Sequence, residues 1–178
     1  MSTTLIESPT PQIGATALAD LRAAIAGRVS VPSDADWDAE RSPWAVNVDQ
    51  RPALVVRPRD SADVVTAVRF AAAHGLRVAA QGTGHNPAPL GDLAGTMLVR
   101  TDLMRDVQID SATKSARVGA GALWSDVVAG AGEQGLAALA GSSPDVGVVG
   151  YTLGGGVSWL ARSHGLAANS VTAIELVT

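Results

Sequence analysis

Apolar residues recur at helical spacing near the start of the chain. Leu18, Leu21 and Ile25 lie on one face of a predicted helix over residues 17–26, which Thr16 caps and a glycine ends. The polar segment that precedes this helix is predicted to be disordered.

Residues 29–48 follow without a hydrophobic period. They contain two prolines, Trp37, Trp44 and several carboxylates, so we predict an ordered but irregular connection. The two tryptophans are expected to cover an edge of the core. Residues 1–47 are therefore expected to form a tail, a short helix and this connection ahead of the main domain.

A strand, a helix and a second strand are predicted next. The apolar runs at residues 53–57 and 77–80 are the strands, and Ser61 begins the helix between them. Such a βαβ unit has parallel strands. The helix positions expected to face the core are Val64, Val65, Val68 and Ala72, and His74 closes the helix as a structural residue.

The second strand runs into a glycine-rich loop, Gln81-Gly82-Thr83-Gly84-His85-Asn86. Glycine permits positive φ and lets main-chain N–H groups approach an anion, so the loop can hold a phosphate while it presents one histidine. It lies at the carboxyl end of a strand, where open α/β sheets bind ligands. The loop by itself is also compatible with a tight turn that carries a surface histidine.

Shorter elements and many glycines are predicted in the second half. A strand over residues 96–100 precedes a hairpin of residues 107–110 and 116–119, and a short helix follows over residues 123–131. A last strand is predicted over residues 171–177. A strand there would leave a sheet edge open, so we expect the chain to be part of a longer protein.

Residues 130–135 match the dinucleotide fingerprint G-x-G-x-x-G. The residues before it have helical rather than strand spacing, and no acidic residue lies at the ~20-residue offset where a ribose 2′-hydroxyl needs one. We interpret this segment as the glycine-rich end of a helix, not as a nicotinamide-dinucleotide site.

Composition narrows the class of protein. The chain has 178 residues, of which 47% are hydrophobic and 17% charged, as is typical of one globular domain with a core. A net charge of −4 without a basic block argues against nucleic-acid binding. The lack of cysteine excludes disulfides and thiolate chemistry. The sequence contains neither an apolar run of membrane-spanning length nor a secretory signal, so we expect a cytoplasmic protein with no membrane partner.

Three segments together resemble one protein family. They are residues 51–58 with the helix after them, the Gly82-Thr83-Gly84-His85-Asn86 loop, and Ser143-Pro144-Asp145-Val146-Gly147 with the glycines that follow. Their order is similar to the FAD-binding domain of the vanillyl-alcohol oxidase/p-cresol methylhydroxylase (PCMH-type) superfamily, above all to its berberine-bridge-enzyme-like and 6-hydroxy-D-nicotine oxidase-like FAD-linked oxidases. The resemblance implies an α+β fold over residues 48–178, with an N-terminal βαβ subdomain followed by a mixed sheet and short helices.

The resemblance also implies FAD as the cofactor and a role for individual residues. His85 matches the histidine that forms a covalent bond to the flavin 8α-carbon. A buried pyrophosphate close to few cationic side chains needs N–H donors, which glycine-rich loops supply. The other positions that match cofactor contacts are Gly82, Thr83, Gly84, Asn86, Thr101, Asp102, Leu103, Ser142, Ser143, Val146, Gly147, Gly150, Gly154, Gly155, Gly156, Leu166, Asn169 and Val177.

The chain departs from the family pattern at several positions. Ser143 stands where relatives with a doubly attached flavin carry a cysteine, so a second covalent bond is excluded. Gln81 stands where many relatives have a basic residue, Thr83 where they have a glycine, and Asn169-Ser170 where they have Asp-Asn. Relatives continue into the rest of the flavin domain and a substrate domain. We therefore expect an incomplete domain with no catalytic acid or base among these residues.

Other polar residues are expected to be structural. His164 is predicted to be a surface residue, and three histidines without cysteine do not make a metal site. Asp102 is also compatible with a strand end, and Asp126 with a solvated helix face. Ser142-Ser143 lacks the pattern of a serine nucleophile.

Three functions remain open at this stage. The first is the FAD-binding part of an oxidase that takes hydride from a small organic substrate onto histidyl-linked FAD and passes the electrons to dioxygen. The second is a reductase or dehydrogenase of the same superfamily with noncovalent FAD. The third is a flavin-binding fragment without turnover.

Overall fold

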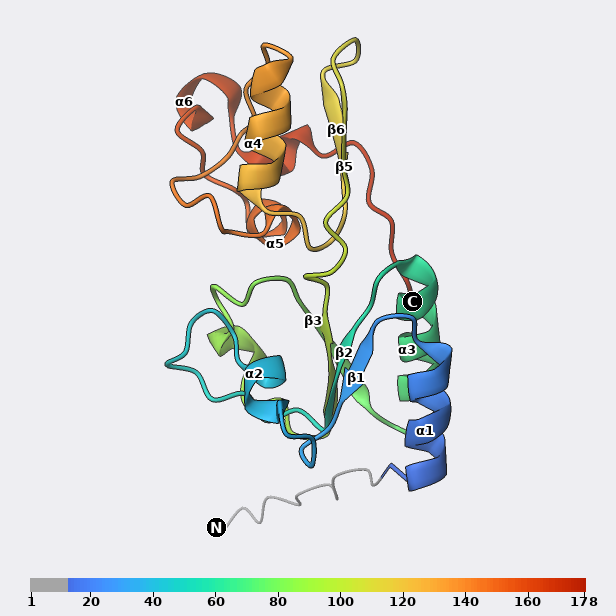
Figure 1. Ribbon diagram of the computed structural model, residues 1–178. Coiled ribbons are helices and arrows are strands. Elements are labelled where there is room, and N and C mark those ends of the chain that lie inside the picture. Colours follow the sequence, from blue (N-terminus) through green and yellow to red (C-terminus); the bar gives the residue numbers. More distant parts are fainter. Residues whose placement is uncertain (1–12) are drawn as a thin grey trace, which may run out of the picture.

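The computed structural model describes residues 13–178, which form two groups of elements joined near residue 105 (Figure 1). We call residues 13–105 the sheet lobe and residues 106–178 the hairpin lobe. Their mixture of helices, parallel strands and antiparallel strands confirms the predicted α+β class. The prediction of a disordered start falls almost wholly on residues 1–12, which lie outside the described residues.

A four-stranded sheet forms the centre of the sheet lobe. Its strands are β1 (Arg28–Ser30), β2 (Leu54–Arg57), β3 (Arg77–Gln81) and β4 (Thr96–Arg100), in the order β1-β2-β4-β3. β2, β4 and β3 are parallel, and β1 is antiparallel to β2. The predicted βαβ unit is present, but β4 lies between its two strands. All three parallel strands therefore end at the same edge.

Helices cover the sheet on both faces. On one face, α1 (Ala15–Ala24) and α3 (Ser61–Ala73) contact each other (Figure 1). The core between them and the sheet contains Leu21, Ile25, Leu54, Val56, Ala67, Ala71, Met97 and Val99. On the other face, Trp37 packs against a buried cluster that includes Val55 and Leu98, which confirms its predicted place at the edge of a core.

The predicted core face of α3 is wrong. Ala67 and Ala71 are fully buried, whereas Ala72 is exposed and the valines are only partly buried. Alanines let the helix approach the sheet closely. A pattern based on large apolar residues does not include them. The face also includes Asp63, which is buried because its carboxylate accepts hydrogen bonds from backbone N–H groups, among them those of Ala26 and Gly27.

Residues 29–48 are more regular than predicted. They contain most of β1 and the short helix α2 (Trp37–Arg41). β1 is short, and its pairing with β2 joins residues far apart in sequence, so no local pattern marks it. The turn before β1 needs glycine, because a Cβ at Gly27 would lie 1.9 Å from the carbonyl oxygen of Arg57.

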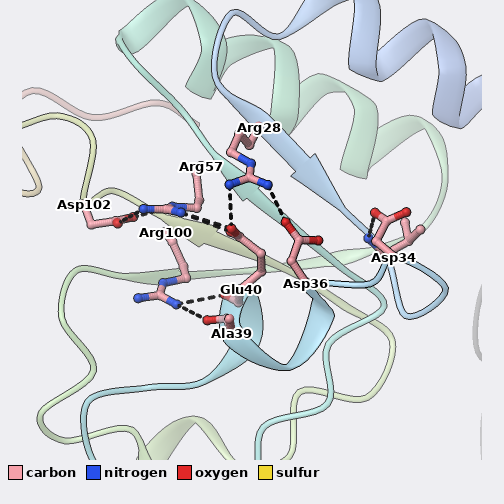
Figure 2. A network of polar contacts seen from close by, with 9 residues as sticks. Arg28, Asp34, Asp36, Ala39, Glu40, Arg57, Arg100 and Asp102 are labelled. Atoms are coloured by element: carbon pink, nitrogen blue, oxygen red, sulfur yellow. Dashed lines mark hydrogen bonds and ion pairs between the residues drawn. The ribbon is translucent and has the colours of Figure 1, made fainter.

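A network of ion pairs fixes α2 to the sheet (Figure 2). The carboxylate of Glu40, which is buried, pairs at 3.1 Å with both Arg28 and Arg57. Arg57 also pairs with Asp102, and the hydrogen bond between them raises the pKa of Arg57. Arg100 donates to the carbonyl oxygen of Glu40 at 2.8 Å. Because the charges are mutually paired, burial of Glu40 leaves no carboxylate unneutralised.

The hairpin lobe contains short elements around a small core. The predicted hairpin is confirmed as β5 (Val107–Asp110) and β6 (Ser115–Val118), and the predicted helix as α4 (Trp124–Glu133). Residues 130–135 form the end of α4, as interpreted. The remaining elements are α5 (Val148–Leu153), α6 (Ala161–His164) and the 3-10 turn η2 (Ala167–Ser170), while another such turn, η1 (Ala88–Leu90), belongs to the sheet lobe.

The predicted strand over residues 171–177 is wrong. Residues 171–178 leave the hairpin lobe as a segment without regular structure (Figure 1). Arg117 on β6 pairs with Glu175 at 2.7 Å, but no described strand pairs with this segment. Alternating apolar residues form a strand only where a neighbour accepts their backbone hydrogen bonds. Among residues 13–178, no helix combines the length and hydrophobicity needed to cross a membrane.

Candidate functional site

Two glycine-rich loops meet where the parallel strands end. The first loop follows β3 and contains Gly82, Thr83 and Gly84. The second loop, residues 141–147, comes from the hairpin lobe. A Cβ at Gly147 would lie 3.7 Å from Cγ2 of Thr83, so the loops are in contact. This is the edge of a parallel sheet at which ligands commonly bind.

In the first loop, the two central carbonyl groups are paired and the N–H groups are not. The carbonyl oxygens of Thr83 and Gly84 accept hydrogen bonds from the backbone N–H groups of Trp44 and Ala45, at 3.0 and 3.1 Å. Within residues 13–178, no backbone carbonyl accepts a hydrogen bond from the N–H groups of residues 83–86. The loop therefore offers free N–H donors while the carbonyl groups of Thr83 and Gly84 are occupied, which suits an anion.

The second loop repeats this arrangement. The carbonyl oxygens of Pro144 and Val146 accept from Ser125 and Trp124 at the start of α4, at 2.8 and 3.0 Å. The N–H groups of residues 145–147 donate to no backbone carbonyl in the described part of the chain. Two sets of backbone donors, one from each lobe, can satisfy the two charges of a pyrophosphate.

Gly84 is required for the shape of the first loop. Its φ is +78°, and a Cβ there would lie 2.7 Å from Cβ of Pro43 and 2.9 Å from Nε2 of Gln81. Gln81 is only 6% exposed, and neither polar atom of its side chain has a hydrogen-bond partner in the described structure. Buried amides are normally paired, so this side chain is a further candidate to contact a bound group.

His85 is held by three neighbours. Its ring stacks on Trp44, with centroids 4.1 Å apart, and its Nδ1 lies 2.7 Å from the hydroxyl of Thr83. Its Nε2 is buried and lies 3.7 Å from Oδ2 of Asp145. The side chain is 20% exposed. The imidazole is therefore fixed at the junction of the two loops and does not project into bulk solvent.

Other residues singled out in the sequence occupy varied places. Thr101 is buried, and its hydroxyl donates to the carbonyl oxygen of Ala120 at 2.9 Å, beside Gly82. Asp102 pairs with Arg57 at the end of β4. Asn86, Leu103, Ser142, Ser143 and Gly150 are exposed, and Val146 packs against the core of the hairpin lobe.

A third group of predicted contacts follows α5, and the ring of Tyr151 links part of it to the second loop, because it lies beside both Gly141 and Gly156. Gly156 packs against Tyr151 and Ala167, and the carbonyl oxygens of Gly155 and Gly156 accept hydrogen bonds from η2. Within the described residues, no hydrogen bond joins the first loop to Gly154, Gly155, Gly156, Leu166, Asn169 or Val177. The glycine triplet allows close packing here. His164 is exposed, as predicted, and Asp126 caps the start of α4 and pairs with Arg105.

Sequence reasoning missed two residues of the site. Trp44 was predicted to cover a core edge, but it is 59% exposed and stacks on His85. Asp145 had no role assigned, yet it accepts a hydrogen bond from Nε1 of Trp44 at 3.0 Å. The two residues lie in different lobes, so no local pattern connects them. Asp145 does stand inside a segment that carried the family resemblance.

The geometry defines a class of site, namely the edge of a parallel sheet where two loops present free backbone N–H groups beside one fixed histidine. The comparisons with known proteins then give the family. Residues 52–178 match the FAD binding domain family. The chain is 37% identical over 154 residues to (R)-6-hydroxynicotine oxidase of Paenarthrobacter nicotinovorans. The matched segment covers 86% of this chain and 34% of the relative. It is 31% identical over 152 residues to xylooligosaccharide oxidase of Thermothelomyces thermophilus, covering 84% and 31%.

Solved structures agree with these relatives. The crystal structure of 6-hydroxy-D-nicotine oxidase from Arthrobacter nicotinovorans has a TM-score of 0.76 at 37% identity, covering 82% of this chain and 32% of that one. A berberine-bridge-enzyme-like protein of Physcomitrella patens has a TM-score of 0.77 at 27% identity, covering 85% and 34%. This chain belongs to the FAD binding domain family, which confirms the predicted family and cofactor. It spans about a third of the length of the relatives it matches.

Proposed function

We propose that this chain is the FAD-binding part of a FAD-linked oxidase and that His85 bonds covalently to the flavin. The observation that carries the proposal is the placement of His85, fixed by Thr83 and Trp44 between two loops rich in unpaired N–H groups. A bound FAD supplies the acceptor for a hydride. A neutral imidazole supplies the nucleophile for a single attachment.

The two loops have separate tasks in this proposal. The N–H groups of residues 83–86 and 145–147 bind the pyrophosphate, and Gly84 and Gly147 let the backbone approach it. Residues 101–103 run beside the cofactor. The further contacts carried over from the family are Ser142, Ser143, Val146, Gly150, Gly154, Gly155, Gly156, Leu166, Asn169 and Val177.

The reaction proposed for the whole protein is oxidation of a small organic molecule. Hydride passes from the substrate to FAD, and dioxygen then accepts the electrons. The names of two relatives, a hydroxynicotine oxidase and a xylooligosaccharide oxidase, support this reaction class. We place the catalytic base outside these residues, the FAD-binding domain at residues 48–178, and the protein in the cytoplasm.

Loss of the covalent flavin in a His85→Ala variant tests the proposal. We expect the wild-type protein to keep its yellow colour and an FAD-sized mass increment after acid denaturation, and the variant to release its flavin. The matched control is His164→Ala, because His164 is exposed and far from the loops in sequence. Covalent flavin that persists in His85→Ala would contradict the proposal. A wild-type protein that releases FAD on denaturation would favour the noncovalent reductase or dehydrogenase.

A further inference from the structure

Asp145 is the charged side chain that faces the buried nitrogen of His85. Its Oδ2 lies 3.7 Å from Nε2 of His85, and the same oxygen accepts the Trp44 indole hydrogen bond at 3.0 Å. We propose that Asp145 is a positioning residue that holds the His85 proton on Nε2 and stabilises the charge that this ring gains during flavin attachment. This inference rests on the proposed function and deepens it.

The environment of the ring selects one arrangement of its proton. A neutral imidazole has one N–H donor and one lone pair, and the partner of each nitrogen decides which is which. At 3.7 Å the Asp145 carboxylate makes no hydrogen bond to Nε2, but its negative charge attracts a hydrogen there, so it favours N–H at Nε2. The Thr83 hydroxyl, 2.7 Å from Nδ1, can donate to the lone pair there. Nδ1 is therefore the nucleophilic nitrogen.

Asp145 is held at this place although its side chain is 50% exposed. The carbonyl groups of its two neighbours, Pro144 and Val146, are hydrogen-bonded to the start of α4, which fixes the backbone on both sides. Trp44 fixes the carboxylate. Trp44 is in turn fixed to the first loop by its backbone hydrogen bond to Thr83 and by its stacking on His85. The contacts thus form a closed ring around one imidazole.

The attachment step explains why a carboxylate is useful here. In this proposal His85 would hold the flavin through a bond from Nδ1 to the methyl carbon, and that carbon would give up one C–H proton to solvent. The two electrons of the broken C–H bond would go to dioxygen, the oxidant of the proposed reaction. The imidazole would be positively charged until its Nε2 proton leaves to solvent. A nearby carboxylate lowers the energy of that charged ring, as in a carboxylate–histidine–nucleophile triad.

The rate of covalent incorporation tests the role of Asp145. Full-length protein is produced without flavin, FAD is added, and the bound fraction is followed by intact mass after denaturation. We expect Asp145→Asn to slow attachment by about tenfold to a hundredfold, the range typical of a residue that orients a histidine. Noncovalent FAD affinity is measured alongside by quenching of flavin fluorescence, and the attachment rate should fall by more than any change in this affinity explains. The matched control is Glu133→Gln, which removes one exposed carboxylate at the end of α4.

Two further measurements separate positioning from a general structural effect. Trp44→Phe keeps an aromatic ring beside His85 but removes the donor to Asp145, so it should slow attachment less than Asp145→Asn. Nitrogen-15 NMR of His85 in the flavin-free protein should report the Nε2–H form in the wild type. It should report a mixture of both forms in Asp145→Asn.

The outcomes distinguish this inference from the function on which it rests. Covalent flavin in His85→Ala would overturn both. If His85→Ala abolishes attachment while Asp145→Asn attaches FAD at the wild-type rate, only the role of Asp145 is overturned. The same holds if Asp145→Asn slows attachment only in proportion to weaker FAD binding, with an unchanged NMR signature.

Discussion

The two lobes of this chain bury their apolar residues to different extents. In the sheet lobe, Leu54, Val56 and Met97 are completely buried, and helices cover both faces of the sheet. The core of the hairpin lobe is formed by Ala122, Trp124, Val127 and Val148. Other apolar side chains of that lobe lie on its surface, among them Leu153, Val157 and Trp159. The sheet lobe therefore contains most of the hydrophobic stabilisation.

The candidate site depends on both lobes, because each supplies one loop. Close backbone contacts join the lobes beside the site. A Cβ at Gly121 would lie 2.0 Å from the carbonyl oxygen of Thr101, and Gly121 donates to the carbonyl oxygen of Met104 at 2.8 Å. The stable lobe thus fixes the first loop directly and the second loop through these contacts. We therefore expect that some substitutions lower the free energy of unfolding and that different ones weaken flavin binding.

The largest effect is expected from a matched pair of leucines. Leu54→Ala should lower the free energy of unfolding by about 2–5 kcal/mol, since it opens a cavity beneath the sheet. Leu153→Ala, at a side chain that is 65% exposed, should change it by about 0.5 kcal/mol or less. Urea denaturation measures both values. Equal losses would show that the hairpin lobe buries Leu153 in solution.

A matched pair of glycines should show an intermediate effect on FAD retention. Gly84→Val should weaken noncovalent FAD binding roughly tenfold or more, because a strain of ~1–3 kcal/mol and a clash with Pro43 displace the loop. Gly91→Val is the control, since Gly91 has a similar φ of +70° but nothing within 4 Å of its Cβ position. It should lose some stability and keep its FAD affinity. Equal FAD affinity in both variants would argue against the first loop as the phosphate site.

The smallest effect is expected from surface carboxylates. The backbone N–H of Val31 and the ion pair with Arg22 lower the pKa of Asp34, even though partial burial opposes this. Because its pKa is lowered in the folded state, ionised Asp34 stabilises the fold at pH values above the ordinary aspartate pKa. This contribution is lost as the pH falls through the lowered pKa. Asp34→Asn should lower the free energy of unfolding by about 0.2–1 kcal/mol at neutral pH and leave it unchanged in strong acid.

The control for this pH dependence lies in the hairpin lobe. Hydrogen bonds from Thr113, and from the backbone N–H of Ala112, lower the pKa of Asp110 in the β5–β6 turn. Asp110→Asn should leave the urea midpoint of the sheet lobe unchanged at every pH. A shift equal to that of Asp34→Asn would show that the two lobes unfold as one unit.

Sequence patterns located the elements well where neighbours along the chain supply the pattern. The strands at Leu54–Arg57, Arg77–Gln81 and Thr96–Arg100, the hairpin and α4 were predicted within a few residues. The errors occur where a distant partner decides the outcome. β1 forms because β2 lies beside it, and residues 171–178 have no such neighbour among the described strands.

The position of the glycine-rich loop with its histidine after a strand could be predicted from the sequence alone, because glycine spacing and loop position are local properties. The family could be predicted from the resemblance of three segments, and the match over residues 52–178 confirms it. Only the tertiary structure brought Asp145 and Trp44 to His85. Trp44 and Asp145 are 101 residues apart in the sequence. The order of strands in the sheet, with β4 inserted between β3 and β2, was also decided in three dimensions. The physical reason is the same in both cases. Contacts between distant residues depend on how the lobes pack, and this packing leaves no periodic trace in the chain.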